Sequence, residues 1–199
     1  MFRIIEKQYR QPKGFLGKII SKLMQRANSY AYDKLVSKLS IQENDQILEI
    51  GFGHGLGIQK ILAKYNCIIT GIDFSSLMYA KSIKRFKKQI DNNKVKLLYG
   101  NFLEHTFESN FYDKIYVLNV TYFWTSLEIP FVKIRNLLKE NGCFHLFMDD
   151  DVELTRPGFT KGDVFCMHSV EHVIEQLKQA GFQHVAYQKE DGYFIQCEK

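Results

Sequence analysis

The residues best placed to do chemistry are three glycines at alternate positions, Gly51, Gly53 and Gly55. Glycine tolerates positive φ and lets a ligand approach the backbone more closely than any Cβ would allow. Acidic side chains flank this run, with Glu49 before it and Asp73 after the next apolar segments. The spacing differs from the G-x-G-x-x-G fingerprint of dinucleotide sites. It therefore favours a ligand of another class.

The flanking side chains indicate what that ligand is. A carboxylate at Glu49 would repel a pyrophosphate and attract a cationic amino-acid head group. Asp73 could accept hydrogen bonds from both hydroxyls of a ribose. Asn101 could exchange hydrogen bonds with an adenine amino group, and Phe102 could lie against the adenine ring. A nucleoside that bears an amino acid and a positive charge fits these positions, and S-adenosylmethionine is such a molecule.

Apolar periodicity predicts the elements that position these residues. The expected strands span residues 47–50, 67–72, 95–99, 113–120, 143–148, 183–188 and 193–198. The expected helices span residues 58–64, 75–89, 129–138 and 168–180, after one or two amphipathic helices over residues 15–39, and a turn is expected over residues 140–142. This alternation predicts an α/β fold with a doubly wound, mainly parallel seven-stranded sheet. The last two strands should form an edge hairpin, so that one edge strand runs antiparallel.

In such a sheet the ligand binds beyond the carboxyl ends of the strands, near the first strand-to-helix turn. The glycine run follows the first expected strand, Asp73 closes the second, and Asn101 follows the third. The candidate residues should therefore meet at one edge of the sheet.

At these residues the sequence resembles the class I S-adenosylmethionine-dependent methyltransferases, in the branch of small-molecule enzymes that includes ubiquinone and menaquinone biosynthesis. The resemblance covers roughly residues 46–148. It rests on five segments in order, ILEIGFGHGLG, TGIDFS, YGNF, FYDKIYVLNVTYFW and LLKENGCFHLF. It implies a Rossmann-like methyltransferase fold, S-adenosylmethionine as cofactor, and in-line transfer of its sulfonium methyl group to a small-molecule acceptor.

The resemblance also assigns roles within the site. It places Glu49, Gly51, Gly53 and Gly55 at the methionine portion, Asp73 at the ribose, Phe74 and Met78 on one face of the adenine, Asn101 and Phe102 on its other side, and Asn119 near the amino-acid head. Many relatives have Asp where this chain has Asn101, so the adenine contact departs from the family pattern.

Candidates for the acceptor side come from the stretch after the fourth strand. Tyr122 and Trp124 could line the acceptor pocket, where an aromatic face attracts the sulfonium. Phe123 fits pocket and core equally. Tyr122 is a catalytic candidate because Asn119 and Tyr122 have the N-x-x-Y spacing that amino-group methyltransferases use. Asp149 is a candidate general base, although a solvated loop also explains the run of three aspartates at 149–151. His54 is expected to face solvent or pack over the turn rather than to act as a base.

Metal binding and export receive no support from the sequence. His168 and His172 lack a diagnostic metal spacing, so no metal is predicted. The four cysteines are scattered, and the first residues lack the apolar block of a signal peptide. These features predict reduced thiols and a cytoplasmic location.

Positive charge is concentrated at the start of the chain. The net charge is +5, and residues 1–40 hold nine Lys or Arg against Glu6 and Asp33. We expect residues 1–40 to form a basic helical lid on an S-adenosylmethionine-binding domain over residues 41–199. Nucleic-acid binding is not expected because the rest of the chain has no basic excess. A non-catalytic regulatory protein and a membrane-peripheral quinone or lipid methyltransferase remain alternatives, with membrane contact not favoured. The acceptor, its reacting atom and the oligomeric state stay open.

Overall fold

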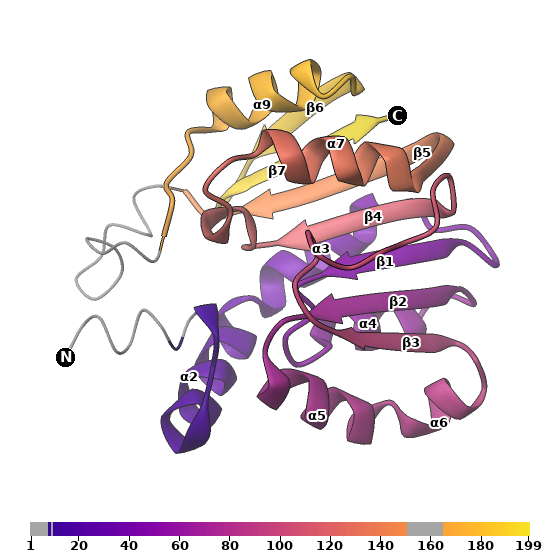
Figure 1. The fold of residues 1–199 in the computed structure, drawn as a ribbon, viewed down its shortest axis with the longest axis vertical. Helices are drawn as coiled ribbons and strands as arrows, with labels where there is room; N and C mark the ends of the chain where they lie inside the picture. The colour runs from indigo at the N-terminus through magenta and orange to yellow at the C-terminus, as the bar shows by residue number, and fades with distance from the viewer. Residues whose placement is uncertain (1–7, 9, 151–164) are drawn as a thin grey trace.

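The computed structural model describes residues 8, 10–150 and 165–199, and its centre is a seven-stranded sheet with helices on both faces (Figure 1). The sheet order is β3-β2-β1-β4-β5-β7-β6. The strands are β1 (Gln46–Ile50), β2 (Ile68–Asp73), β3 (Val95–Tyr99), β4 (Tyr112–Leu118), β5 (Leu138–Met148), β6 (Gln183–Lys189) and β7 (Tyr193–Glu198). The predicted doubly wound, mainly parallel sheet is confirmed.

The edge hairpin of β6 and β7 is also confirmed, but the antiparallel strand is not the outermost one. β7 runs antiparallel to β5 and to β6, so the edge strand β6 points the same way as the parallel strands. Phe194 and Ile195 of β7 are buried, whereas β6 is almost entirely exposed. The more apolar strand therefore takes the inner position.

Helices connect the strands along most of the chain. They are α2 (Gly14–Ala27), α3 (Ser29–Lys38), α4 (Leu56–Leu62), α5 (Ser76–Arg85), α6 (Lys87–Asp91), the 3₁₀ turn η1 (Thr121–Phe123), α7 (Glu128–Leu137) and α9 (Val170–Gln179). Ser75 and Ser169 cap α5 and α9 by accepting backbone N–H groups. The single helix expected over residues 75–89 is divided at Phe86, whose backbone leaves the helical region.

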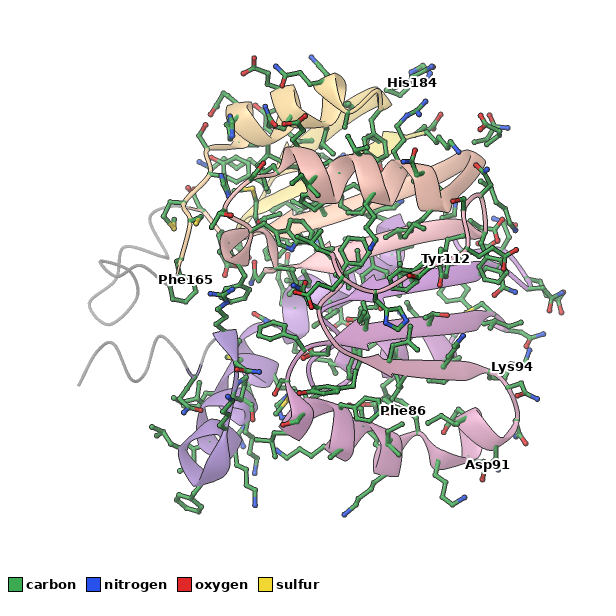
Figure 2. All side chains as sticks on the ribbon, viewed as in Figure 1. Phe86, Asp91, Lys94, Tyr112, Phe165 and His184 are labelled. Atoms are coloured by element: carbon green, nitrogen blue, oxygen red, sulfur yellow. The ribbon has the colours of Figure 1, made fainter. Side chains whose placement is uncertain are left out.

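Two apolar layers hold the helices against the sheet. Leu48 and Ile50 of β1 belong to the layer under α7 and α9, while Ile47 belongs to the layer under α3 and α4. Strand side chains alternate between faces, so Glu49 points the same way as Ile47. Figure 2 shows side chains filling both layers, with Asp91 and His184 projecting at the periphery.

The turn expected over residues 140–142 is absorbed into β5. The β4–β5 register shifts between Tyr112 and Lys114, which pair with Leu138 and Cys143. Between these two pairs β5 has more residues than β4, and Asn141 in that extra stretch adopts a φ of +65°. The strand therefore begins directly at the end of α7.

Helix α2 lies beyond the carboxyl ends of the parallel strands and stands away from the sheet (Figure 1). In contrast, α3 joins the core through Leu35 and Val36, each 1% exposed. Among the described residues, no helix is both long and apolar enough to cross a bilayer.

Candidate functional site

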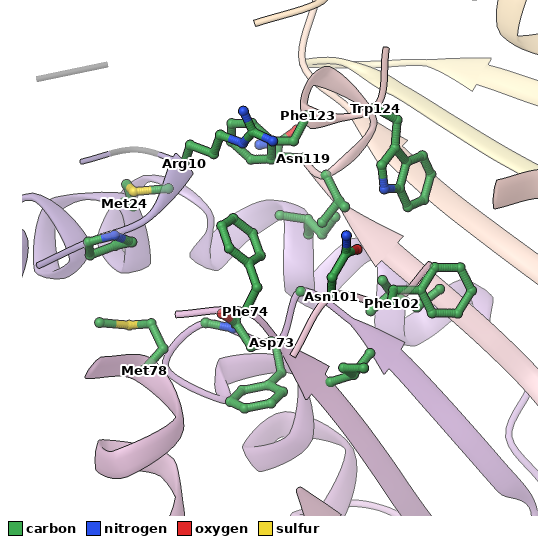
Figure 3. Close-up of a pocket in the computed structure, with 18 of the residues that line it drawn as sticks. Arg10, Met24, Asp73, Phe74, Met78, Asn101, Phe102, Asn119, Phe123 and Trp124 are labelled. Carbon is green, nitrogen blue, oxygen red and sulfur yellow. The ribbon is translucent and has the colours of Figure 1, made fainter. Parts of the chain in front are cut away.

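A cavity of about 400 Å³ opens at the carboxyl ends of the strands, between the glycine turn and α2 (Figure 3). Its walls come from the loops after β1, β2, β3 and β4 and from the N-terminal segment. This is the edge of the sheet at which the sequence predicts the ligand. The volume is typical of a small-molecule site.

The glycine turn is held by packing on both sides and open in the middle. A Cβ on Gly51 would lie 2.6 Å from Val120 Cγ2, and one on Gly55 would lie 2.3 Å from Phe86 Cε2. A Cβ on Gly53 would meet nothing within 4 Å. All three glycines have positive φ. Gly51 and Gly55 therefore fix the shape of the turn, while Gly53 leaves room for a ligand against its backbone.

Asp73 links this turn to the loop after β2. Its Oδ2 accepts the Gly53 N–H at 2.8 Å, and its Oδ1 accepts the Ser75 N–H at 2.7 Å. Burial raises the pKa of Asp73 to about 6, and the two backbone N–H groups oppose that rise. Each carboxylate oxygen keeps a further lone pair. Asp73 can therefore hold the loop and still accept hydrogen bonds from a ligand in the cavity.

Glu49 lies beneath the turn, on the α3 side of the sheet, and not in the cavity wall. Its Oε1 accepts the Tyr32 hydroxyl at 2.9 Å, while its Oε2 and the Tyr116 hydroxyl have no hydrogen-bond partner among the described residues. Burial raises the pKa of Glu49 to about 8. The carboxyl predicted to attract a cationic head group thus lies one layer below the cavity, because the strand alternation turns it inward.

Of the residues expected to surround the adenine, the structure brings only some to the cavity. Phe74, Met78 and Asn101 line the cavity, and the Asn101 side chain bonds to Glu104 and to the Leu103 N–H. Phe102 borders the cavity, but it is 4% exposed and its ring points away into the core (Figure 3). It packs there against the rings of Phe107 and Trp124.

Asn119 lies at the end of β4 and joins three segments. Its Nδ2 donates to Asp149 Oδ2 at 2.9 Å and to Asn28 Oδ1 at 3.3 Å. Its Oδ1 accepts the Asp149 N–H at 3.1 Å and the Tyr122 hydroxyl at 3.4 Å. These bonds fix the loop after β5 and link Asn119 to the end of α2. Asn119 also lines the cavity.

The aromatic residues after β4 separate between cavity and core. Phe123 and Trp124 line the cavity, whereas Tyr122 is 2% exposed and turns its hydroxyl to Asn119 and the Asp149 carbonyl. The 3₁₀ turn η1 sends successive side chains in different directions. Phe123 therefore takes the position that the sequence assigned to Tyr122. Asp150 forms an ion pair with Lys189, while Asp151 lies outside the described residues.

His54 lines the cavity from within the glycine turn. Burial lowers its pKa to about 4, and the nearby Lys81 and Arg85 contribute in the same direction. Nε2 of His168 contacts the Trp124 carbonyl at 3.0 Å and thereby anchors the end of η1. Within the described part of the chain, no group of three or more His, Cys, Asp or Glu has metal-site geometry.

One face of α2 supplies cavity residues that sequence reasoning missed. Ser21, Met24, Gln25 and Asn28 recur at helical spacing and line the cavity, followed by Tyr32 of α3. Polar residues on that face, four and three positions apart, were the available signal. The preceding segment is tied to the loop after β2, because Gln11 Nε2 donates to the Phe74 carbonyl and Ser75 Oγ donates to the Pro12 carbonyl.

The sheet order, the glycine turn at its first strand and the acidic residue closing its second strand together give this chain the Rossmann-like fold of methyltransferases. Residues 47–142 match the methyltransferase domain family. Residues 47–142 are thus a methyltransferase domain, and the fold is that of solved S-adenosylmethionine-dependent methyltransferases.

Among curated proteins, the sterol 24-C-methyltransferase of Kluyveromyces lactis is similar, with 27% identity over 180 residues that cover 85% of this chain. The chain spans about half the length of this relative, 47%. A methyltransferase structure from Methanococcus maripaludis has a TM-score of 0.71 at 18% identity and covers 92% of this chain and 93% of its own.

Phosphoethanolamine N-methyltransferase 2 of Haemonchus contortus, solved with S-adenosyl-L-methionine, has a TM-score of 0.72 at 14% identity over 85% of this chain and 52% of its own. At these identities the structures establish the fold. The ubiquinone and menaquinone branch that the sequence resembles stays a prediction.

Proposed function

We propose that this chain transfers the methyl group of S-adenosylmethionine to a small acceptor with an apolar body. The observation that carries this proposal is one cavity shared by two kinds of residue. Gly53, Asp73 and Asn101 form a wall suited to the cofactor, and Phe123 and Trp124 form an apolar wall facing it (Figure 3). Donor and acceptor would therefore meet in a single space.

The residues present fit the cofactor. The backbone at Gly53 and at Gly100 borders space that a Cβ would fill, so a ligand can lie directly against it. Asp73 keeps lone pairs for the ribose hydroxyls. Asn101 is exposed at the cavity and offers both donor and acceptor atoms. When bound, S-adenosylmethionine supplies a methyl group already activated by the sulfonium charge.

The chain's own contribution to the reaction would be positioning. Holding two reactants in line removes much of the entropic barrier of a bimolecular step. Met24 of α2 and Phe123 of η1 border the cavity from two different elements and would limit the access of water. Asp149 and Tyr122 are bonded to Asn119, so we assign them to positioning that residue and not to proton abstraction.

The apolar character of the acceptor rests on the lining and on the relatives. Met24, Phe74, Phe123, Trp124 and Ile129 border the cavity. Apolar and aromatic side chains favour ligands with apolar surface, because the transfer of that surface out of water lowers the free energy. The curated relative named above is a sterol methyltransferase by its name. An acceptor with a hydrocarbon body is the class that both observations support.

Label transfer tests the proposal. Purified protein would be incubated with methyl-labelled S-adenosylmethionine and a panel of sterols, quinols and prenylated compounds, with phosphoethanolamine as the polar comparison. We expect label in an organic-soluble product. Phe123→Ala should lower kcat/KM for that acceptor about tenfold while the cofactor Kd stays unchanged. Cofactor binding without transfer to any apolar acceptor would contradict the proposal.

A further inference from the structure

Helix α2 presents three distinct faces, and one of them is an exposed apolar face. Phe15, Ile19 and Leu23 recur every four residues and are 78%, 44% and 54% exposed, and Leu16 beside them is 41% exposed. Soluble helices usually turn such a stripe toward the core. Here the core side is taken by Gly17, Ile20 and Ser21. We name Phe15, Leu16, Ile19 and Leu23 the apolar stripe.

A basic edge runs alongside the apolar stripe. Lys18, Lys22 and Arg26 also recur every four residues, and all three are exposed. Residues 8–27 contain two further basic residues, Arg10 and Lys13, and no acidic residue. The third face of α2 lines the cavity through Ser21, Met24 and Gln25. The helix therefore separates the cavity on one side from a basic and apolar surface on the other.

We propose that α2 docks this chain on an anionic lipid bilayer, with the apolar stripe inserted at the headgroup level and the basic edge against lipid phosphates. An amphipathic helix with Lys and Arg beside Phe and Leu binds in this way and needs to enter only about 5–10 Å. Each basic residue close to an anionic surface adds to the attraction. Helix α2 stands away from the sheet (Figure 1), and the side chains of the apolar stripe and of the basic edge are exposed.

Charge and size argue against a protein on this surface. In a symmetric dimer the same patch meets itself, so two copies would bring Lys18, Lys22 and Arg26 of each chain together. A helix of 14 residues is about 21 Å long, and a stripe one side chain wide falls short of the roughly 800 Å² that each partner contributes to a standard protein interface. A bilayer has no such minimum area.

The docking has a consequence for the acceptor. The apolar stripe and the cavity-lining face belong to the same turns of α2, so docking brings the cavity close to the lipid. An acceptor dissolved in the bilayer could then reach the cavity with little exposure to water. This consequence rests on the proposed function, whereas the docking itself does not.

Vesicle co-sedimentation of the full chain tests the docking. We expect the protein to pellet with phosphatidylcholine vesicles that contain phosphatidylglycerol, to stay in solution with phosphatidylcholine alone, and to be released by high salt. Ile19→Gln/Leu23→Gln should weaken binding about tenfold or more. Lys18→Gln/Lys22→Gln should weaken it about thirty-fold.

Matched variants control for exposure and charge. Val132 and Tyr187 are 41% and 49% exposed, so Val132→Gln/Tyr187→Gln removes two comparable apolar side chains away from α2. Lys84→Gln/Lys88→Gln removes two exposed charges from α5 and α6. Both variants should pellet as the wild type does. Cofactor calorimetry in vesicle-free buffer, run on every variant, separates loss of docking from loss of the proposed function.

Any of three results would overturn the docking. The first is a wild type that remains in solution with anionic vesicles at low salt. The second is Ile19→Gln/Leu23→Gln binding to vesicles as strongly as the wild type. The third is a wild-type dimer in sedimentation velocity that this variant converts to a monomer, which would assign the apolar stripe to an interface between copies.

Discussion

Glu49 is a carboxyl group enclosed by tyrosines. It is 1% exposed, one of its oxygens is bonded to Tyr32, and the other has no partner among the described residues. Burying an ionised carboxylate without full hydrogen bonding is unfavourable, so the folded protein favours the protonated form. The pKa of about 8 expresses that preference.

Glu49→Gln should therefore change how stability depends on pH. Because the folded pKa lies above the ordinary value of 4.5, Glu49 contributes stability that is fully present below that value and is lost as the pH rises through about 8. The variant should lack this loss, so its free energy of unfolding should rise relative to that of the wild type by on the order of 5 kcal/mol between acid and alkaline pH. Urea unfolding from pH 4 to pH 9 measures the difference. Parallel pH profiles for the two proteins would contradict it.

The glycines of the turn differ in how much space a Cβ would find around them. Gly55→Ala would push a Cβ against Phe86 and should lower the free energy of unfolding by about 3 kcal/mol, from overpacking and positive-φ strain together. Gly53→Ala has open space around it and should cost only the strain, about 1 kcal/mol. Urea midpoints for the two variants give the comparison. Equal losses would show that backbone strain alone governs the turn.

Helix caps connect element stability to the cavity. Ser75→Ala and Ser169→Ala each remove an N-cap and should each lower stability by about 1 kcal/mol. Ser75 also bonds to the Pro12 carbonyl beside the cavity, whereas Ser169 caps the distant α9. Only Ser75→Ala should also weaken cofactor binding. Thermal unfolding with and without cofactor separates the two effects, and equal cofactor stabilisation in both variants would refute the distinction.

Helix α7 holds the loop after β3 through one side chain. Lys133 Nζ donates to the carbonyls of Phe102, Leu103 and His105 at 2.8, 3.0 and 2.6 Å. Lys133→Met should increase amide hydrogen exchange over residues 101–105 and weaken cofactor binding about tenfold. Arg135→Met, which removes a contact to the Gly181 carbonyl from the same helix, is the control. Unchanged exchange in that loop would count against a positioning role.

Across the whole molecule, periodicity predicted the sheet because most of its strands are short apolar runs bounded by turn residues. The glycine turn and Asp73 were predictable for the same reason, since a doubly wound sheet fixes where strands end. The direction of Glu49 was available too, because period-two alternation places it with Ile47. The predicted division at residue 40 stays untested.

The rest depends on tertiary packing. A 3₁₀ turn decides that Phe123 and not Tyr122 reaches the cavity, and local sequence does not fix that choice. The polar face of α2 resembles a solvated face until the cavity is seen behind it. β7 takes its place inside β6 because Phe194 and Ile195 find partners on β5, which is a long-range contact.

The cavity at the glycine turn should bind S-adenosylmethionine through Asp73, and isothermal titration calorimetry of the purified chain measures that binding. We predict saturable binding of one cofactor per chain, a Kd at least about tenfold higher for Asp73→Asn, and an unchanged Kd for Asp113→Asn, whose carboxylate bonds to Gln46 and Lys139 at the opposite end of the sheet. A folded wild-type protein that gives no saturable heat, or that binds equally well with Asp73→Asn, would contradict the account.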